Sequence, residues 1–269
     1  MTTSPPQRPT LDAILAVART RVEALRGRAA ELERRAAAAP PVRRFQEPTE
    51  AVGLIAEVKR RSPSQGDIRT DLDPVEHARA YVRGGAVAVS VLTDEAHFGG
   101  SLDDLVRVAA AVPVPVLRKD FILDELQIME ARAAGASAIL LIVRALAPDT
   151  LQALARAAAG WGLPTLIEVH SAAELEPALA AGPGAIGVNA RDLATFAVDL
   201  RRAEAVIRDV PNNVAVVAES GIESRADVER VAAAGADFVL VGASVARQKD
   251  PEKAVKALVG VKRQPEIRS

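Results

Sequence analysis

The chain has 269 residues, of which 49% are hydrophobic and 26% are charged, and its formal net charge is −1. This near-neutral balance gives no basic footprint for a nucleic acid and no cationic face for a membrane surface. The chain has no cysteine and only three histidines. Disulfides and thiolate chemistry are therefore excluded, and neither a thiolate nor a histidine metal site is expected.

Apolar residues are spread along the chain in short runs. No run approaches the roughly 18–20 residues that span a bilayer. Arginines interrupt every apolar stretch near the N-terminus, which is not typical of a signal peptide. We therefore expect a cytoplasmic protein with no membrane partner and no nucleic-acid partner.

Two helices are expected before the regular part of the chain begins. Residues 1–10 are rich in Pro, Thr and Ser and are expected to be disordered. Thr10 can cap a helix whose apolar stripe contains Leu11, Ile14, Leu15, Ala18, Val22 and Leu25. A second helical stretch covers 29–39 and ends at a Pro-Pro pair. We treat 1–48 as an N-terminal extension that packs on the main domain, 49–262 as that domain and 263–269 as a tail.

From residue 49 onward, short apolar runs alternate with Ala-rich helical patterns. The runs lie near 54–58, 86–92, 114–117, 138–143, 165–169, 185–188, 214–218 and 237–241. Eight buried strands that alternate with helices predict parallel βα units. A helix-end glycine precedes the second, fourth, sixth and eighth runs, as in a doubled βαβα module. These features predict an α/β protein, a (β/α)8 TIM barrel with an N-terminal helical extension. A doubly wound open sheet is the alternative, but no GxGxxG follows the first strand.

Polar and charged residues gather at the ends of the predicted strands. In a barrel of this kind the active site lies at the C-terminal ends of the strands. Charges buried there are costly unless they compensate one another, so a cluster at one mouth is expected. Each residue alone could equally be an ion pair at the rim, but the set favours a catalytic site. Its members are Glu57, Lys59, Lys119, Glu168, Asn189, Arg191, Glu219 and Ser220.

Lysine is used sparingly in this chain. Lys59 and Lys119 are the only lysines before residue 248, although arginine is frequent there. A desolvated ammonium group can release its proton, whereas a guanidinium group effectively cannot. Both lysines end an apolar run, so both are candidates for proton transfer. A Schiff base between either lysine and a sugar phosphate is the alternative chemistry.

Two further patterns indicate the substrate. Gly221 and Gly242 closely follow the seventh and eighth strands, where barrel enzymes commonly bind a phosphate through backbone N–H groups. Phe98 and Phe121 lie in the second and third βα loops and indicate an aromatic or apolar substrate portion. Each phenylalanine could equally anchor its own loop on the barrel. His170 follows the fifth strand, and we assign it no catalytic role.

Several segments resemble the signature of indole-3-glycerol-phosphate synthases. They are IAEVKRRSPS (55–64), LRKDFI (117–122), LIEVH (166–170), GVNARDL (187–193) and AESGI (218–222), and the resemblance covers about residues 10–258. It implies a barrel enzyme of tryptophan biosynthesis that acts on 1-(2-carboxyphenylamino)-1-deoxyribulose 5-phosphate. Ring closure with loss of carbon dioxide and water would give indole-3-glycerol phosphate. No cofactor and no metal is expected.

The resemblance also implies roles for individual residues. Lys119 matches the general acid that protonates the substrate carbonyl, and Glu168 matches the base that assists the later dehydration. A lysine among other cations would have its pKa lowered toward the working pH, which suits an acid. The division of acid and base work between these two residues, Glu57 and Lys59 stays open.

The other matched positions are expected to bind substrate. Ser62 and Arg191 would contact anionic groups, Asn189 and Glu219 the sugar hydroxyls, Ser220, Gly221, Gly242 and Ala243 the phosphate, and Phe98 and Phe121 the carboxyphenyl ring. Ala243 and Gln65 depart from the Ser and Lys that many relatives have. The expected partner is a phosphorylated small molecule, and a monomer is compatible with the sequence.

Two other interpretations are disfavoured. The phosphoribosylanthranilate isomerase barrel relies on a cysteine, which this chain lacks. A degenerate barrel kept as a binding or assembly module would have lost its strand-end charges, and every expected one is present.

Overall fold

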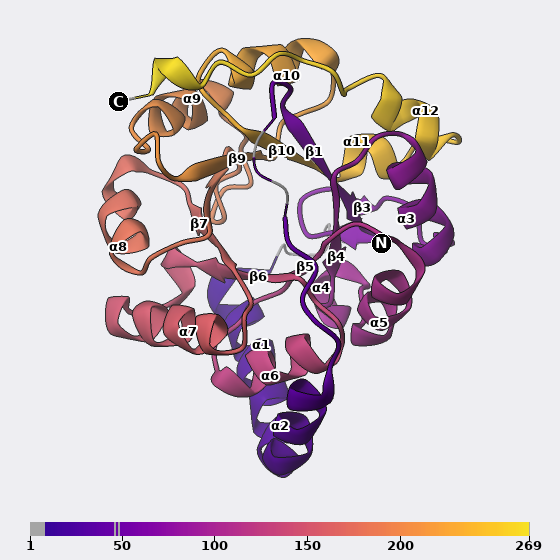
Figure 1. The fold of residues 1–269 in the computed structure, drawn as a ribbon, viewed down its shortest axis with the longest axis vertical. Coiled ribbons are helices and arrows are strands. Elements are labelled where there is room, and N and C mark those ends of the chain that lie inside the picture. Colours follow the sequence, from indigo (N-terminus) through magenta and orange to yellow (C-terminus); the bar gives the residue numbers. More distant parts are fainter. Residues whose placement is uncertain (1–8, 46, 48, 269) are drawn as a thin grey trace, which may run out of the picture.

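The computed structural model describes residues 9–45, 47 and 49–268, and the disorder expected at the N-terminus falls largely on residues outside this part. Eight parallel strands form a closed barrel in the order β1-β10-β9-β8-β7-β6-β5-β4 (Figure 1). Consecutive barrel strands therefore pair side by side, and the last strand closes on the first. The strands are β1 (Gly53–Val58), β4 (Ala88–Leu92), β5 (Val116–Lys119), β6 (Ala138–Ile142), β7 (Thr165–Val169), β8 (Ala185–Asn189), β9 (Ala215–Glu219) and β10 (Phe238–Val241).

These strands confirm the eight predicted runs and the predicted (β/α)8 barrel. Both faces of each strand are covered, which is why the strands read as continuous apolar runs and not as alternating ones. The outer ring in Figure 1 consists of α3 (Pro74–Arg83), α5 (Leu102–Ala111), α6 (Glu125–Ala133), α7 (Pro148–Gly160), α8 (Leu175–Ala180), α9 (Leu200–Arg208), α10 (Arg225–Ala232) and α12 (Pro251–Lys256).

Local sequence signals set the limits of these helices. Asp73, Ser101, Asp124 and Ser224 accept hydrogen bonds from first-turn N–H groups of α3, α5, α6 and α10. The predicted helix-end glycines are all left-handed, because Gly85, Gly135, Gly182 and Gly235 have φ angles of 100°, 86°, 69° and 104°. Each precedes a strand of even number in the barrel, β4, β6, β8 or β10. Glycine adopts this conformation without a Cβ penalty, so it allows the chain to turn from helix to strand.

Short helices and a hairpin lie at the mouth of the barrel. A two-stranded hairpin of β2 (Arg61–Ser62) and β3 (Gly66–Asp67) follows β1. The short helices α4 (Glu95–Phe98) and α11 (Ala243–Ala246) follow β4 and β10. Three single 3₁₀ turns complete the chain: η1 (Val143–Ala145), η2 (Ala172–Glu174) and η3 (Pro265–Ile267).

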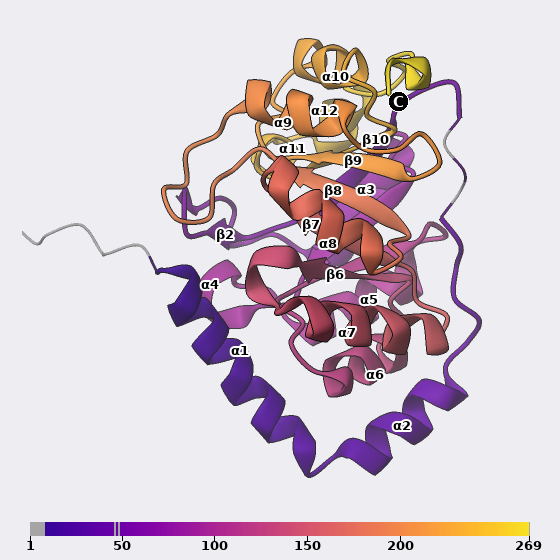
Figure 2. The same ribbon diagram turned by 90° about the vertical axis from the view of Figure 1, so that its left-hand side faces the viewer.

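The N-terminal extension forms two helices, α1 (Leu11–Arg26) and α2 (Ala29–Ala38). Thr10 caps α1 as predicted, since its side chain accepts a hydrogen bond from Ala13. Figure 2 shows α1 on the side of the barrel where β2 and α4 lie, while α2 lies below. The buried stripe of α1 packs into the same apolar cluster as the barrel-interior residues Leu117 and Leu140. The extension thus completes the core near the mouth.

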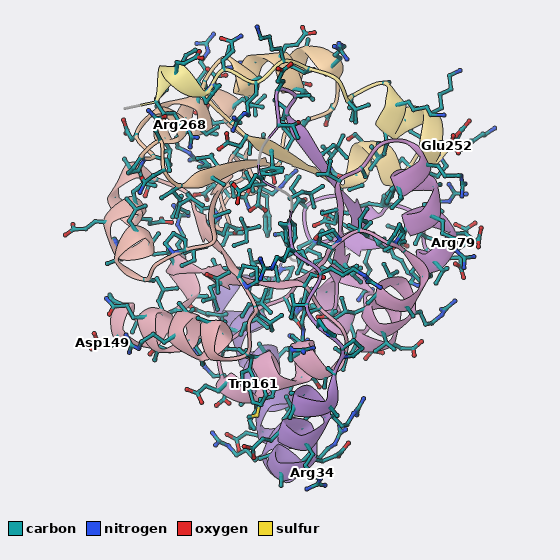
Figure 3. All side chains as sticks on the ribbon, viewed as in Figure 1. Arg34, Arg79, Asp149, Trp161, Glu252 and Arg268 are labelled. Carbon is teal, nitrogen blue, oxygen red and sulfur yellow. The ribbon has the colours of Figure 1, made fainter. Side chains whose placement is uncertain are left out.

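The last described residues bind to the wall of the barrel. Arg268 is 4% exposed, pairs with buried Asp237 at 2.8 Å and donates to the carbonyl of Val214 at 2.8 Å. Asn212 donates its side-chain N–H to the carbonyl of Arg268. Figure 3 labels Arg268 close to the C-terminus. Within the described part of the chain, no helix is long and apolar enough to cross a membrane.

Candidate active site

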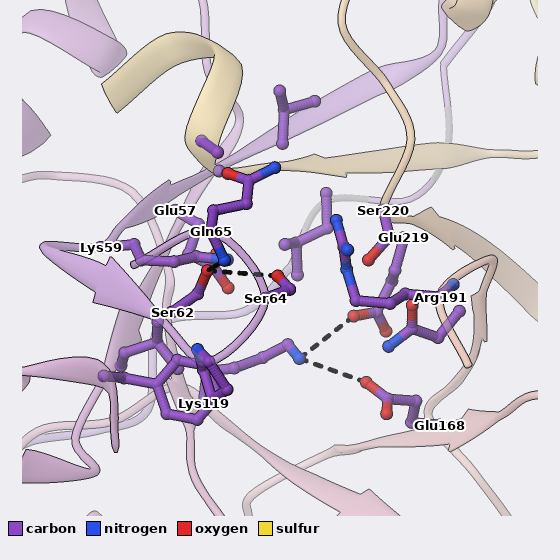
Figure 4. A pocket seen from close by; sticks show the side chains of 18 of the residues that line it. Glu57, Lys59, Ser62, Ser64, Gln65, Lys119, Glu168, Arg191, Glu219 and Ser220 are labelled. Carbon is purple, nitrogen blue, oxygen red and sulfur yellow. Dashed lines mark hydrogen bonds and ion pairs between the residues drawn. The ribbon is translucent and has the colours of Figure 1, made fainter. Parts of the chain in front are cut away.

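The C-terminal ends of the barrel strands surround one pocket, which contains all of the predicted site residues (Figure 4). Residues from all eight barrel strands and their following loops meet there. The predicted residues that line it are Glu57, Lys59, Ser62, Phe98, Lys119, Phe121, Glu168, Asn189, Arg191, Glu219, Ser220, Gly221, Gly242 and Ala243. The sequence therefore identified residues that are far apart in the chain and adjacent in space.

Lys119 lies at the centre of the charged part of the pocket. Its Nζ atom is 3.2 Å from Oε2 of Glu168 and 3.2 Å from Oε2 of Glu219 (Figure 4). Burial alone would lower the pKa of Lys119, but the nearby carboxyl groups, above all the carboxylate of Glu168, outweigh burial and raise it. The expectation that neighbouring cations lower this pKa is therefore wrong. Carboxylates are the nearest charges, so the ammonium group is fully protonated at neutral pH.

Glu219 is a buried carboxyl group with a raised pKa. Burial, reinforced by the charges of Glu168 and Glu57 and opposed by Lys119, raises the pKa of Glu219 to about 8. Among the described residues, its Oε1 atom has no hydrogen-bond partner. Gly187 on β8 leaves the space for this carboxyl group, because a Cβ at that position would lie 2.2 Å from Oε1. Glu219 is thus a protonated group at neutral pH with one oxygen available to a substrate.

Glu168 remains ionised although it is 1% exposed. Burial would raise the pKa of Glu168, but the charges of Lys119 and His170 and a hydrogen bond from Asn189 lower it overall. Oδ1 of Asn189 accepts the backbone N–H of Arg191 at 3.0 Å, which fixes the orientation of the amide. An ionised carboxylate next to a protonated carboxyl group gives the site a base and an acid.

Lys59 pairs with a carboxylate of its own strand. Its Nζ atom is 2.5 Å from Oε2 of Glu57, which is 3% exposed. Gly242, at the start of α11, makes room for both side chains. A Cβ there would lie 2.3 Å from Oε2 of Glu57 and 3.2 Å from Nζ of Lys59. A glycine after β10 therefore leaves the space that this charged pair occupies.

The loops after β9 and β10 carry the residues that are expected to bind a phosphate. Ser220 and Gly221 are both left-handed, with φ angles of 66° and 76°. Ser244 donates its hydroxyl to the carbonyl of Ile222 at 2.9 Å and thereby links the two loops. Gly242 starts α11, whose first N–H groups have no acceptor within the helix. Backbone N–H groups of two loops therefore surround the same end of the pocket.

A cation also lies at this end. Gln65, which departs from the Lys of many relatives, accepts a hydrogen bond from the guanidinium group of Arg247 at 2.9 Å. Arg247 follows α11, and Gln65 lines the pocket. Arg247 thus brings a positive charge next to the position where the lysine is missing.

The pocket also has an apolar lining. The rings of Phe98 and Phe121 lie 6.4 Å apart, centre to centre, with an angle of 38° between their planes. Both line the pocket, and Phe121 is 8% exposed. Further apolar lining comes from residues that the sequence analysis did not select, Leu140, Ile142, Leu193, Ile222 and Leu240. Such a surface suits a planar aromatic group.

A buried ionic network behind Lys119 was also missed. Asp120 is 2% exposed and accepts from both guanidinium nitrogens of Arg21, at 2.7 and 3.1 Å. It also accepts from Arg118 and Thr93 and from the backbone N–H of Phe121. Arg21 belongs to α1, so the N-terminal extension is fastened to the loop that carries Lys119 and Phe121. The sequence does contain one indication of this network, because Arg118 and Asp120, which carry opposite charges, flank Lys119.

Comparison with known proteins places the chain in one family. Residues 11–258 match the family described as indole-3-glycerol phosphate synthase. The chain is 50% identical to indole-3-glycerol phosphate synthase 2 of Streptomyces coelicolor over 233 residues, which is 86% of this chain and 90% of that protein. It is 49% identical to the indole-3-glycerol phosphate synthase of Mycolicibacterium smegmatis over 233 residues, with 85% of each chain covered.

Solved structures support the fold. A 3-hexulose-6-phosphate synthase matches with a TM-score of 0.63 at 17% identity, over 81% of this chain and all of that chain. A thiamine phosphate pyrophosphorylase from Pyrococcus furiosus matches with a TM-score of 0.59 at 19% identity, over 77% of this chain and 93% of that chain. At these identities the two structures support the barrel fold and indicate nothing about function. The family match and the relatives near 50% identity show that the chain belongs to the indole-3-glycerol phosphate synthase family.

Proposed function

We propose that this chain converts 1-(2-carboxyphenylamino)-1-deoxyribulose 5-phosphate to indole-3-glycerol phosphate, carbon dioxide and water. The observation that carries the proposal is the position of Lys119, which lies between two carboxyl groups, with aromatic rings on one side of the pocket and two backbone loops on the other. The substrate has a matching layout: an aromatic ring at one end, a phosphate at the other and a carbonyl group between them. Binding the two ends would hold the carbonyl group near the ammonium group of Lys119.

Ring closure is the first step. The ring carbon that carries the carboxylate attacks the carbonyl carbon, and the carbonyl oxygen takes a proton from Lys119. An alkoxide is a stronger base than an amine, so the proton moves even though carboxylates raise the pKa of Lys119. Phe98 and Phe121 would hold the attacking ring against the carbonyl group. The carboxylate then leaves as carbon dioxide, and its bonding electrons restore the aromatic ring.

Dehydration is the second step. The new hydroxyl group leaves as water after it takes a second proton, while a base removes a proton from the neighbouring carbon and the indole double bond forms. Glu168 is the ionised carboxylate in position to act as that base. Glu219, whose pKa burial raises to about 8, carries a proton and can hold or protonate the leaving hydroxyl group. Glu57 and Lys59 would hold the anionic groups of the substrate and orient their neighbours.

A Schiff-base mechanism is the second candidate. It requires a neutral amine as nucleophile. Lys119 has a raised pKa because carboxylates surround it, and Lys59 is held in an ion pair with Glu57. Lys119 is therefore held in its charged, non-nucleophilic form, and Lys59 is engaged by a carboxylate. Borohydride added during turnover should therefore trap no covalent adduct, and a trapped adduct would favour the Schiff-base reading.

We also propose that one chain forms a complete enzyme, which acts as a monomer in the cytoplasm. The pocket lies at the mouth of a single closed barrel, with lining residues from every strand of that barrel. Light scattering of the purified protein at assay concentration tests the monomer. An obligate dimer with no activity after dilution would contradict it.

The direct test is turnover of the synthetic carboxyphenylamino substrate by the purified chain. Indole fluorescence should rise with enzyme concentration, and mass spectrometry should detect indole-3-glycerol phosphate with carbon dioxide in equal amount. A substrate analogue that lacks the ring carboxylate should give no carbon dioxide. If the substrate is bound but not converted, the proposed activity is wrong and the binding-module reading gains support.

A further inference from the structure

His170 is a fully buried histidine that the proposed mechanism does not use. It follows β7 directly, and its side chain has no exposed surface. Its Nε2 atom lies 3.4 Å from Oε1 of Glu168, and its Nδ1 atom lies 3.5 Å from Oε2 of Glu174. The imidazole ring therefore separates a carboxylate of the pocket from a carboxylate outside it.

Both neighbours of the ring are acceptors. Burial would raise the pKa of Glu174, but contacts from His170 and Arg144 outweigh burial and lower it to about 2. Glu168 is ionised as well, because Lys119 and His170 lower its pKa. An imidazole ring donates from both nitrogens only in its charged form. The ring can thus hold a proton between the two carboxylates and release it toward either one.

On the outer side of His170, the contacts continue through Glu174 to the surface of the protein. Glu174 is half-buried, and its Oε1 atom accepts from Arg144 at 2.7 Å. Arg144 also pairs with Asp192 at 3.1 Å, and both of these side chains are partly exposed. Ser171 donates its hydroxyl to Glu174. Solvent protons can therefore reach Glu174 without passing through the mouth of the barrel.

The inner end reaches the proposed general acid. The two oxygens of Glu168 have different partners, since Oε1 faces His170 and Oε2 lies 3.2 Å from Nζ of Lys119. Lys119, Glu168, His170 and Glu174 form one series of proton-binding groups, in which neither ring nitrogen of His170 makes a hydrogen bond among the described residues and each lies within 3.5 Å of a carboxylate oxygen. It runs from the centre of the pocket to the outer edge of β7.

The proposed reaction requires such a supply. The carbonyl oxygen takes one proton to become a hydroxyl group and a second proton to leave as water. The base recovers only one proton from the neighbouring carbon. Because the substrate carboxylate leaves as neutral carbon dioxide, each turnover takes up one proton from solvent. A substrate that occupies the pocket would block access from its mouth, so a second route by which solvent protons reach Lys119 would serve the reaction.

We propose that His170 is a positioning residue that transfers solvent protons from Glu174 to Glu168, from which Lys119 is recharged. In each cycle Glu174 takes a proton from water, the neutral ring accepts it at Nδ1, and the imidazolium formed releases its Nε2 proton to Glu168; a turn of the ring, with the remaining N–H directed back toward Glu168, then restores the starting state. The groups that face this path are Glu168 on β7, Asn189 on β8, Glu174 on η2 and, through Glu174, Arg144 on η1. The proposal rests on the proposed function, because that reaction creates the need for a proton.

The test compares His170→Gln with wild-type enzyme. Glutamine keeps a donor for Glu168 but cannot accept and release a proton. We expect kcat to fall about tenfold or more, with KM within about threefold. The solvent deuterium isotope effect on kcat should increase, and the loss should grow as the pH rises from about 6 to 9, where solvent protons become scarce. Glu174→Gln should show the same three changes.

The controls separate a proton path from a structural role. His77→Gln removes a different buried histidine, on α3, and should leave kcat and the isotope effect unchanged. Unchanged kcat, pH profile and isotope effect in His170→Gln and Glu174→Gln would overturn the path. If His170→Gln does not fold, the result for Glu174→Gln alone decides whether the proton path is correct. Wild-type enzyme that forms no indole product would instead refute the proposed function.

Discussion

Lys119 at the end of β5 and Glu168 on β7 lie 3.2 Å apart and so bridge two strands that β6 separates. Lys119 makes a second contact of the same length with Glu219 on β9. Together with Glu57 on β1, these residues come from the first, third, fifth and seventh strands of the barrel. Barrels fill their interior with layers of four side chains from alternate strands. The charged cluster is such a layer, the one nearest the mouth, with ionisable groups in place of branched apolar ones.

Lys119→Arg should abolish most turnover while the protein stays folded. A guanidinium group keeps the positive charge between Glu168 and Glu219, but it cannot give up a proton at any working pH. We expect the single-turnover rate of indole formation to fall by about 10²–10⁴-fold. The matched control is Lys256→Arg on α12, whose ammonium group is exposed and pairs with Glu252. A near-wild-type rate in Lys119→Arg would remove the general-acid role.

Glu219→Gln should stabilise the protein more at alkaline pH than at acidic pH. Burial raises the pKa of Glu219 from 4.5 to about 8. Between these values the folded chain holds a proton that the unfolded chain releases, so the free energy of unfolding falls as the pH rises through this window. Glutamine does not titrate and removes this loss. Thermal unfolding at about pH 5 and about pH 8.5 measures the effect, with Glu33→Gln on exposed α2 as control. An equal Tm difference at both pH values would contradict the raised pKa.

The fold and the members of the site could be predicted because they depend on local signals. Runs of apolar residues limited by helix-end glycines such as Gly85 and Gly135 determine strands and their number. In a barrel of parallel strands, the C-terminal ends of all the strands lie at the same end of the barrel. Residues such as Glu57 and Glu219, 162 positions apart in the sequence, are brought together by this rule alone.

The remaining features depend on distances that no local pattern encodes. Arg21 and Asp120 are 99 positions apart in the sequence and form a hydrogen bond. The periodicity of a helix does not indicate which residue an arginine on it will contact. Leu140 on β6 lines the pocket. The sequence pattern of an apolar strand residue is the same whether the residue faces a substrate or the core. The pKa of Lys119 was expected to be lowered, because the sequence gives the number of nearby charges and not their order of distance. Two carboxyl groups at 3.2 Å decide its direction.

Gly187→Ala should damage catalysis more than folding. A Cβ on β8 would lie 2.2 Å from Oε1 of Glu219, so the carboxyl group must move away from Lys119. The obstacle is the end of a side chain, so we expect a loss of about 1–3 kcal/mol in the free energy of unfolding. The rate should fall about tenfold or more, because the displaced group no longer meets the substrate. Gly27→Ala is the control, since nothing lies within 4 Å of a Cβ there. Equal activity in the two variants would show that Glu219 needs no fixed position.

Arg268→Ala should destabilise the barrel without changing its chemistry. Asp237 is 1% exposed and precedes β10, and its charge is balanced by Arg268 and Arg263. Removing one partner of a buried ion pair leaves charge uncompensated, but Arg263 remains, so we expect a loss of about 2–3 kcal/mol. For a chain of this size the Tm should fall by roughly 4–10 °C. Arg34→Ala, on the exposed face of α2, is the matched control and should leave the Tm unchanged. Because Arg268 lies outside the pocket, kcat and KM should stay at wild-type values in the folded variant, and an unchanged Tm would mean that Arg263 alone suffices to balance Asp237.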